Sequence, residues 1–131
     1  MSGLKVVDVQ NVDAILREGR TSWILISEQT VGAQNLAMGV NETHVGGSVP
    51  KHKHDTEEEV MFFLQGKGQF ITDDEVIELH PGVCLYNPPG SYHTIVNTGD
   101  EILKFVWIYS PQLESHRIKK TESIKAALEK S

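Results

Sequence analysis

Two short stretches of this chain hold glycines, histidines and a glutamate at regular spacing. The first is Gly46-x5-His52-x-His54-x4-Glu59-x6-Gly66. The second is Gly82-x5-Pro88-x-Gly90-x2-His93-x3-Asn97. Three imidazoles and one carboxylate suit a first-row divalent metal, and this set does not depend on thiolates. The pattern therefore predicts one metal site, held by the side chains of His52, His54, Glu59 and His93.

At these two stretches the chain resembles the cupin family, whose first and second motifs it matches at all ten specified positions. The intermotif segment, residues 67–81, has the length found in compact single-domain members. The resemblance implies an all-β, RmlC-like jelly-roll barrel (a double-stranded β-helix) with short N- and C-terminal helical segments. We expect one domain over residues 1–131, with the barrel at about 35–110, and one divalent transition metal per chain (Fe, Mn, Ni, Co, Cu or Zn).

Composition restricts the classes of partner. The 131 residues suffice for one domain with a sizeable core. The formal net charge of −6, from 12 basic and 18 acidic residues, disfavours nucleic acid and anionic membranes as partners. No apolar run is long enough to span a bilayer, and the N-terminus lacks a hydrophobic signal core. The one cysteine, Cys84, cannot form an internal disulfide and is expected to be a small buried hydrophobe. We therefore expect a cytoplasmic location.

Many short strands separated by Gly, Pro and Asp turns favour an all-β sandwich or barrel. Strand-like segments are predicted over residues 4–9, 23–26, 36–43, 58–65, 69–72, 76–79, 82–86, 93–96 and 102–109, and over 36–43 apolar residues alternate with small or polar ones. Residues 11–18, with Asn11 as a candidate N-cap, predict a helical turn or short helix. Residues 121–130 predict a C-terminal helix.

The spacing of the ligands also predicts which way they face. His52 and His54 are two residues apart, so on a strand both can face the barrel interior. Glu59 opens the next strand and shares its face with Met61 and Phe63. The motif spacing selects Glu59 from the acidic triplet, with Glu58 as the alternative. An octahedral ion on four ligands keeps two positions open for water or substrate, which is typical of a working site.

Other residues are weaker candidates for a role in the site. Four apolar side chains either line a substrate cavity or pack in the core: Met61, Phe63, Phe105 and Trp107. Tyr86 and Tyr92 flank the second motif and are the candidate catalytic residues, although a buried tyrosine usually just packs. His44 and His80 are not expected to be ligands. Three basic residues could bind an anionic substrate or simply lie at the surface: Arg17, Arg20 and Lys104.

The resemblance leaves two main functions open. One is a metal-dependent isomerase, lyase or dioxygenase that acts on a small organic molecule such as a sugar acid or another oxygenated metabolite. The alternative is a non-catalytic module that binds a carbohydrate or another small molecule. We favour the enzyme, because the metal would keep open positions. The chain also resembles small cupin lyases that cleave dimethylsulfoniopropionate, but Met61 stands where those enzymes carry a tyrosine base.

The family resemblance also implies a homodimer, paired through N-terminal strands and sheet faces. A scaffold without chemistry would leave the four predicted ligands unexplained. No helix-turn-helix pattern accompanies the barrel, so a self-contained transcription factor is not expected.

Overall fold

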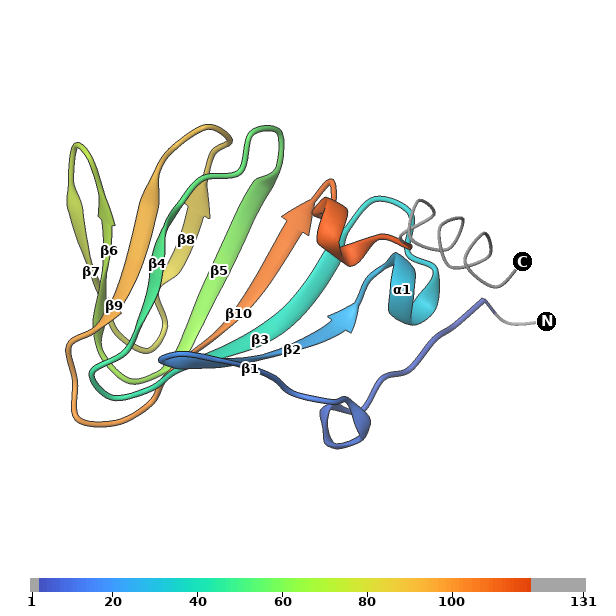
Figure 1. Cartoon of the computed structure of the whole chain (residues 1–131), viewed down its shortest axis with the longest axis horizontal. Helices are drawn as coiled ribbons and strands as arrows, with labels where there is room; N and C mark the ends of the chain where they lie inside the picture. Colours follow the sequence, from blue (N-terminus) through green and yellow to red (C-terminus); the bar gives the residue numbers. More distant parts are fainter. Residues whose placement is uncertain (1–2, 119–131) are drawn as a thin grey trace, which may run out of the picture.

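The computed structural model describes residues 3–118 and shows two antiparallel β-sheets that face each other (Figure 1). In spatial order, the larger sheet contains β1 (Ile15–Arg17), β2 (Arg20–Ile26), β3 (Ala37–Thr43), β10 (Leu103–Ser110), β5 (Glu58–Gln65) and β8 (Cys84–Asn87). The smaller sheet contains β4 (Ser48–His52), β9 (His93–Asn97), β6 (Gly68–Thr72) and β7 (Val76–Leu79). The chain crosses repeatedly between the two sheets, so the expected all-β jelly roll is confirmed.

Most predicted strands agree with the structure: β3 and β5 to β10 lie within about two residues of the predicted ranges, and β2 begins three residues earlier than predicted. The N-terminal region differs. Residues 4–9 form no strand, and a 3₁₀-helix at Val9–Asn11 is capped by the Asp8 side chain, which accepts from the amide of Gln10. The predicted helix over 11–18 is wrong, because Ile15–Arg17 pairs with β2 as strand β1. Pairing with a neighbouring strand has overridden local helix propensity there.

Two further short helices flank the strands. α1 (Glu28–Val31) follows β2, and Ser27 and Thr30 form a reciprocal capping box at its N-terminus. A second 3₁₀-helix, Glu114–His116, follows β10. The helix predicted over 121–130 lies outside the described residues. No helix in the described part of the chain is long and apolar enough to cross a membrane.

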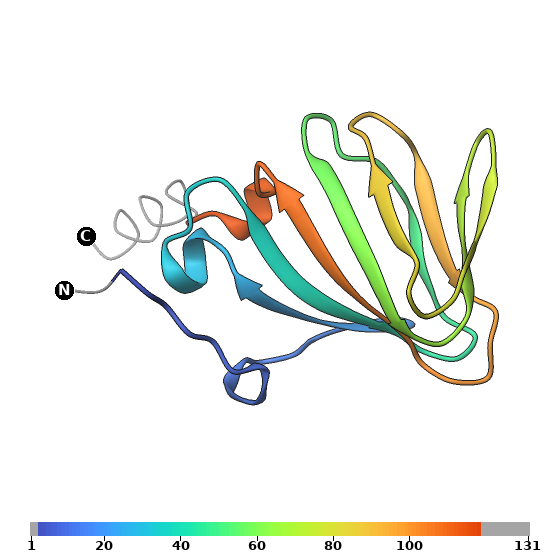
Figure 2. The same ribbon diagram turned by 180° about the vertical axis from the view of Figure 1, so that it is seen from behind.

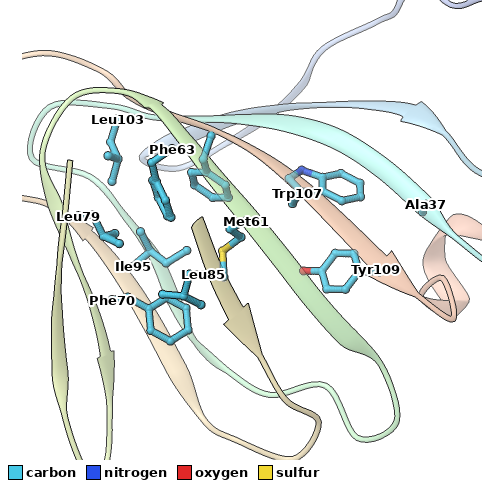
Figure 3. Packing of buried hydrophobic residues seen from close by; sticks show 11 residues of the cluster. Ala37, Met61, Phe63, Phe70, Leu79, Leu85, Ile95, Leu103, Trp107 and Tyr109 are labelled. Atoms are coloured by element: carbon cyan, nitrogen blue, oxygen red, sulfur yellow. The ribbon is translucent and has the colours of Figure 1, made fainter. Parts of the chain in front are cut away.

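Alternation along the strands places the core between the sheets. On β5, Met61 and Phe63 are fully buried, while Phe62 and Leu64 on the other face are exposed. The same alternation on β10 buries Leu103, Phe105, Trp107 and Tyr109. Figure 3 shows these side chains gathered with Phe70, Leu79, Leu85 and Ile95. The core therefore fills one part of the barrel, and Trp107 and Tyr109 lie toward the other part.

The motif glycines lie at turns that need a left-handed backbone. Their φ angles are 76° at Gly46, 88° at Gly66, 93° at Gly82 and 85° at Gly90. Asn97 closes a different turn, donating to the carbonyls of Thr43 and Glu101 and accepting from the amide of Gly99. These positions are structural, as the sequence indicated. Seen from behind (Figure 2), the segment before β1 runs along the β1–β2 side of the larger sheet, away from β6 and β7.

Candidate metal centre and cavity

The three predicted histidine ligands converge from two strand ends and a loop. His52 ends β4 and lies opposite His93, which begins β9. His54 lies two residues beyond β4, in the β4–β5 loop, where its carbonyl accepts from the amide of Gly90 at 2.7 Å. The expectation that both histidines share one strand is therefore wrong for His54. Each of the three rings nevertheless offers one ligand nitrogen, and these three nitrogens all lie within 4.8 Å of one another.

Glu59 comes to the same place from the larger sheet. It begins the inward face of β5, between Tyr109 on β10 and Asn87 on β8. Its side chain is buried, and Oε1 has no hydrogen-bond partner. Oε1 lies 3.8 Å from Nε2 of His93. Glu58 instead faces outward and accepts from the hydroxyl of Tyr86, so the geometry favours Glu59 over Glu58.

Backbone carbonyls orient two of the imidazoles. Nδ1 of His93 lies 3.0 Å from the carbonyl oxygen of Ser91, and Nδ1 of His52 lies 2.6 Å from that of Pro50. A carbonyl only accepts, so each Nδ1 carries the proton and donates. The lone pair of each Nε2 is then free, and this arrangement is common in metal-ligating histidines.

Burial favours the neutral form of two of the imidazoles, His54 and His93. It lowers the pKa of His54 to about 4, with further lowering from the neighbouring His52 and His93. It also lowers the pKa of His93. For the carboxylate the effect is opposite, and burial raises the pKa of Glu59 to about 7 despite hydrogen bonds from Tyr109 and Asn87. Imidazole nitrogens beside a carboxylate with one unpaired oxygen are a donor set that fits a divalent transition metal.

Tyr109 is a site residue that was not singled out from the sequence. Its hydroxyl lies 3.1 Å from Nε2 of His54, and its cross-strand partner is Glu59. Burial, followed by the charge of Glu59, raises the pKa of Tyr109, so the phenol stays protonated and acts as a donor. The signal was present in the alternation Phe105, Trp107, Tyr109, which puts all three side chains on one face.

His116 is the second residue that was missed. It is only 6% exposed, and its ring stacks on the indole of Trp107 at 5.1 Å between centroids and 12° between planes. Nδ1 of His116 has no hydrogen-bond partner, and burial lowers its pKa. His116 belongs to neither motif and follows the last strand, so no spacing in the sequence could have pointed to it.

A cavity of about 520 Å³ extends from the ligand cluster between the two sheets. Of the four predicted pocket residues, Phe105 and Trp107 line it, whereas Met61 and Phe63 belong to the packed core. The cavity walls also include Arg17, Arg20, Ser22, Asn41, Lys51, His52, His54, Glu59, His93, Tyr109 and His116.

Several other candidates lie away from this cavity. Tyr86 is 57% exposed and Tyr92 is 45% exposed, and neither is among the lining residues. Both are exposed beside the second motif, and their role as catalytic candidates stays a prediction. Cys84 is exposed rather than buried, because it occupies the outer face of the edge strand β8.

Comparison with known proteins gives relatives of one family. A family model described as a cupin domain matches residues 40–109. An uncharacterized protein of Methanocaldococcus jannaschii is 39% identical over 73 residues, which are 56% of this chain and 57% of that protein. An oxalate-binding protein of Thermotoga maritima is 34% identical over 61 residues, 47% of this chain and 50% of that protein. The chain thus spans only about half the length of these two relatives.

Other similar proteins cover more of the chain. The polyketide synthase protein CurC of Streptomyces cyaneus is 29% identical over 107 residues, 82% of this chain and 70% of that protein. The solved structure of the polyketide cyclase RemF from Streptomyces resistomycificus superimposes with a TM-score of 0.72 at 25% identity, covering 82% of this chain and 79% of that one. The solved structure of an RmlC-like cupin from Shewanella frigidimarina superimposes with a TM-score of 0.69 at 17% identity. The match covers 81% of this chain and 89% of that one.

Proposed function

Because the chain belongs to the cupin family, with the family model matching more than half of it, we propose that it is a metal-dependent enzyme acting on a small oxygenated organic molecule. The proposed metal ligands are His52, His54, Glu59 and His93. The observation that carries the proposal is the approach of Glu59 Oε1 to His93 Nε2, at 3.8 Å in a buried site.

When Glu59 is ionised, these two atoms are both acceptors. Nδ1 of His93 donates to Ser91, so Nε2 presents a lone pair to the carboxylate. Glu59 Oε1 has no donor of its own. A buried carboxylate oxygen without a partner is costly, and a cation between the two atoms would remove that cost. The nearby rings of His52 and His54 supply two more nitrogens for the same cation.

A divalent ion bound here would polarise an oxygen of the substrate, which supports isomerase, lyase or dioxygenase chemistry. The chain's own residues provide the rest of the site. The protonated hydroxyl of Tyr109 is a hydrogen-bond donor beside the ligands. The rings of Phe105 and Trp107 form an apolar wall that would orient a substrate and exclude water.

A metal-assisted binding module is the second candidate, and the name of the oxalate-binding relative favours it. Both functions would use the same cavity. The enzyme is supported further by His116, which lines the cavity and whose Nδ1 has no hydrogen-bond partner among residues 3–118. Such a group is available for proton transfer, whereas a simple binding site would be expected to satisfy it.

Elemental analysis of protein purified without added metal or chelator tests the site. We expect about one equivalent of a first-row transition metal per chain. Glu59→Gln should lose most of it, whereas Glu58→Gln, a matched change on the outward-facing neighbour, should keep it. A wild-type protein that holds no metal even after reconstitution would contradict the proposal.

Screening the metal-loaded protein then separates the two functions. Iron would direct the screen to oxygen uptake with diols and catechols, and the other metals to sugars, sugar acids and polyketide-like acids followed by NMR. Catalytic conversion supports the enzyme. Stoichiometric binding with the ligand unchanged after prolonged incubation supports the binding module.

Three expectations remain predictions: the single domain over residues 1–131, the homodimer and the cytoplasmic location. Light scattering on the purified protein gives the number of chains directly.

A further inference from the structure

Two arginines face the cavity from its outer edge. Arg17 ends β1, Arg20 begins β2, and the two are cross-strand partners in the β1–β2 hairpin. Both side chains line the cavity that also contains the ligand cluster. The hairpin therefore holds two guanidinium groups together at the entrance region of the site.

Neither guanidinium is neutralised by the protein. Among residues 3–118, ion pairs involve Lys51, Lys53, Lys104, His93 and Arg117, but not Arg17 or Arg20. Like charges placed directly opposite each other destabilise a strand pair. Burial, followed by the charge of Arg17, lowers the pKa of Arg20, as expected for a cation held near another cation. The two positive charges therefore repel each other, and an anion bound between them would relieve that repulsion.

The charge of the cavity also differs from that of the whole chain. The chain carries a formal charge of −6. The cavity wall, however, contains three basic side chains and a single acidic one, the proposed ligand Glu59. Lys51, the third basic side chain, is paired with Asp73 at 3.1 Å, so the two arginines carry the unpaired positive charge. Such a cavity attracts anions even though the protein as a whole repels them.

Contacts between the hairpin and β4 fix how far the arginines lie from the metal ligands. The turn at Gly19 packs against Gly47, where a Cβ would come within 3.0 Å of the Gly19 Cα, and the Gly19 carbonyl accepts from the amide of His44. His52 follows Gly47 by five residues of mainly strand structure, which corresponds to roughly 15 Å. The arginines and the metal ligands therefore occupy opposite ends of one cavity. Ser22 and Asn41, which are cross-strand partners, line the wall between them.

We propose that Arg17 and Arg20 bind an oxoanionic group of the substrate, a carboxylate or a phosphate, at the end remote from the metal ligands. The guanidinium fork matches either group through paired, charge-assisted hydrogen bonds. The substrate is then an elongated anion whose other end bears the oxygens that reach the metal site. This inference rests on the proposed function for the reacting end, but the arginine pair itself stands on its own geometry.

The test uses linear dicarboxylic acids of three to ten carbons and their half methyl esters, with the zinc-reconstituted protein. The half ester keeps one carboxylate for the metal and loses the charge at the other end. Calorimetry should show that a diacid of suitable length binds about tenfold more tightly than its half ester. Arg20→Gln and Arg17→Gln should remove this preference. Lys104→Gln, which removes an equal charge outside the cavity, should keep it.

Equal affinities for diacid and half ester at every chain length would overturn the proposal, as would a preference that survives in both arginine variants. Arg20→Lys, which keeps the charge, should retain part of the preference and shows that the position tolerates substitution. Phosphono acids of the same lengths distinguish a phosphate from a carboxylate as the preferred group.

Metal content is measured for every variant, because it separates this proposal from the proposed function. If the wild-type protein binds no metal, the same comparison on metal-free protein still tests the arginine pair. A diacid preference there, lost in Arg20→Gln, supports anion binding although the metal site fails. Normal metal content without any diacid preference rejects the arginine proposal alone.

Discussion

The indole of Trp107 on β10 occupies the space that a side chain at Gly39 on β3 would need. The two residues are cross-strand partners, and a Cβ at position 39 would lie 2.7 Å from Cε2 of Trp107. The same Cβ would also overlap the carbonyl oxygen of Trp23. The absent side chain lets the indole lie flat against the sheet, where it forms the cavity wall and stacks on His116.

Gly39→Ala should therefore destabilise the protein by about 3 kcal/mol, because both obstructing groups are parts of the packed structure that cannot move independently. Urea unfolding followed by tryptophan fluorescence measures the change. Gly99→Ala is the control, since its Cβ would meet Lys67 at an ordinary 3.5 Å. Equal stability of the two variants would show that the indole can shift freely.

Metal removal should lower the melting temperature, since the proposed ligands join the two sheets through Glu59 on β5 and His93 on β9. At a free metal concentration of 100 times Kd the stabilisation is about 2.7 kcal/mol.

His54→Ala should lower metal affinity by roughly 100-fold or more while the barrel stays folded, because His54 lies in a loop. Differential scanning calorimetry with and without chelator measures both effects.

His80→Ala is the matched control for that experiment, because His80 is exposed and does not line the cavity. It should keep the full metal-dependent shift in melting temperature. A His54→Ala variant that binds metal as tightly as His80→Ala would remove His54 from the ligand set.

His116 should make the metal-free protein less stable in mild acid. Burial lowers its pKa in the folded chain, so the unfolded chain binds more protons once the pH drops below about 6.5. The free energy of unfolding then falls as the pH drops toward the folded pKa, by at most about 1.4 kcal/mol per pH unit from this group. His54 and His93 contribute in the same direction.

His116→Phe should reduce that slope while keeping the ring stacked on Trp107. Chemical unfolding at pH 7.5, 6.5 and 5.5 compares it with wild type and with His80→Phe, which should behave as wild type. An unchanged slope in His116→Phe would mean that His116 is as accessible to protons in the folded chain as in the unfolded one.

Asn97→Ala should destabilise the fold without weakening metal binding. The Asn97 side chain is buried and makes three hydrogen bonds to the backbone, so its removal leaves several polar groups unpaired. We expect a loss of about 2–4 kcal/mol. Asn11→Ala, at an exposed site, should cost little. A folded Asn97→Ala variant with lower metal affinity would show that this residue also shapes the site.

The sequence was most informative where the physical signal is local and repetitive. The apolar run over 58–65 placed β5 correctly, and the two-residue period of a strand predicted that Glu59, Met61 and Phe63 share a face. The motif glycines predicted turns, and four of them do lie in the left-handed region. The spacing of His52, His54 and His93 predicted a convergence that the structure shows.

What the sequence could not predict depends on neighbours distant in the chain. Residues 11–18 resemble a helix locally, but β2 provides a strand partner for Ile15–Arg17. Tyr109 and His116 enter the site only because β10 lies beside β5 and the following turn folds back over Trp107. Phe105 and Trp107 line the cavity, whereas Met61 and Phe63 do not. Composition does not reveal where the packed core ends and the cavity begins.

The arginine hairpin belongs to the edge of the larger sheet, where the three-residue strand β1 pairs with β2 alone. The proposed metal ligands come from β4, β5, β9 and one loop, none of which shares a hydrogen bond ladder with β1. Substitutions of Arg17 and Arg20 can therefore accumulate without disturbing the ligands, provided that the Gly19 turn keeps its contacts with His44 and Gly47. In evolutionary terms, the choice of substrate and the chemistry at the metal reside in separate segments that can diverge at different rates.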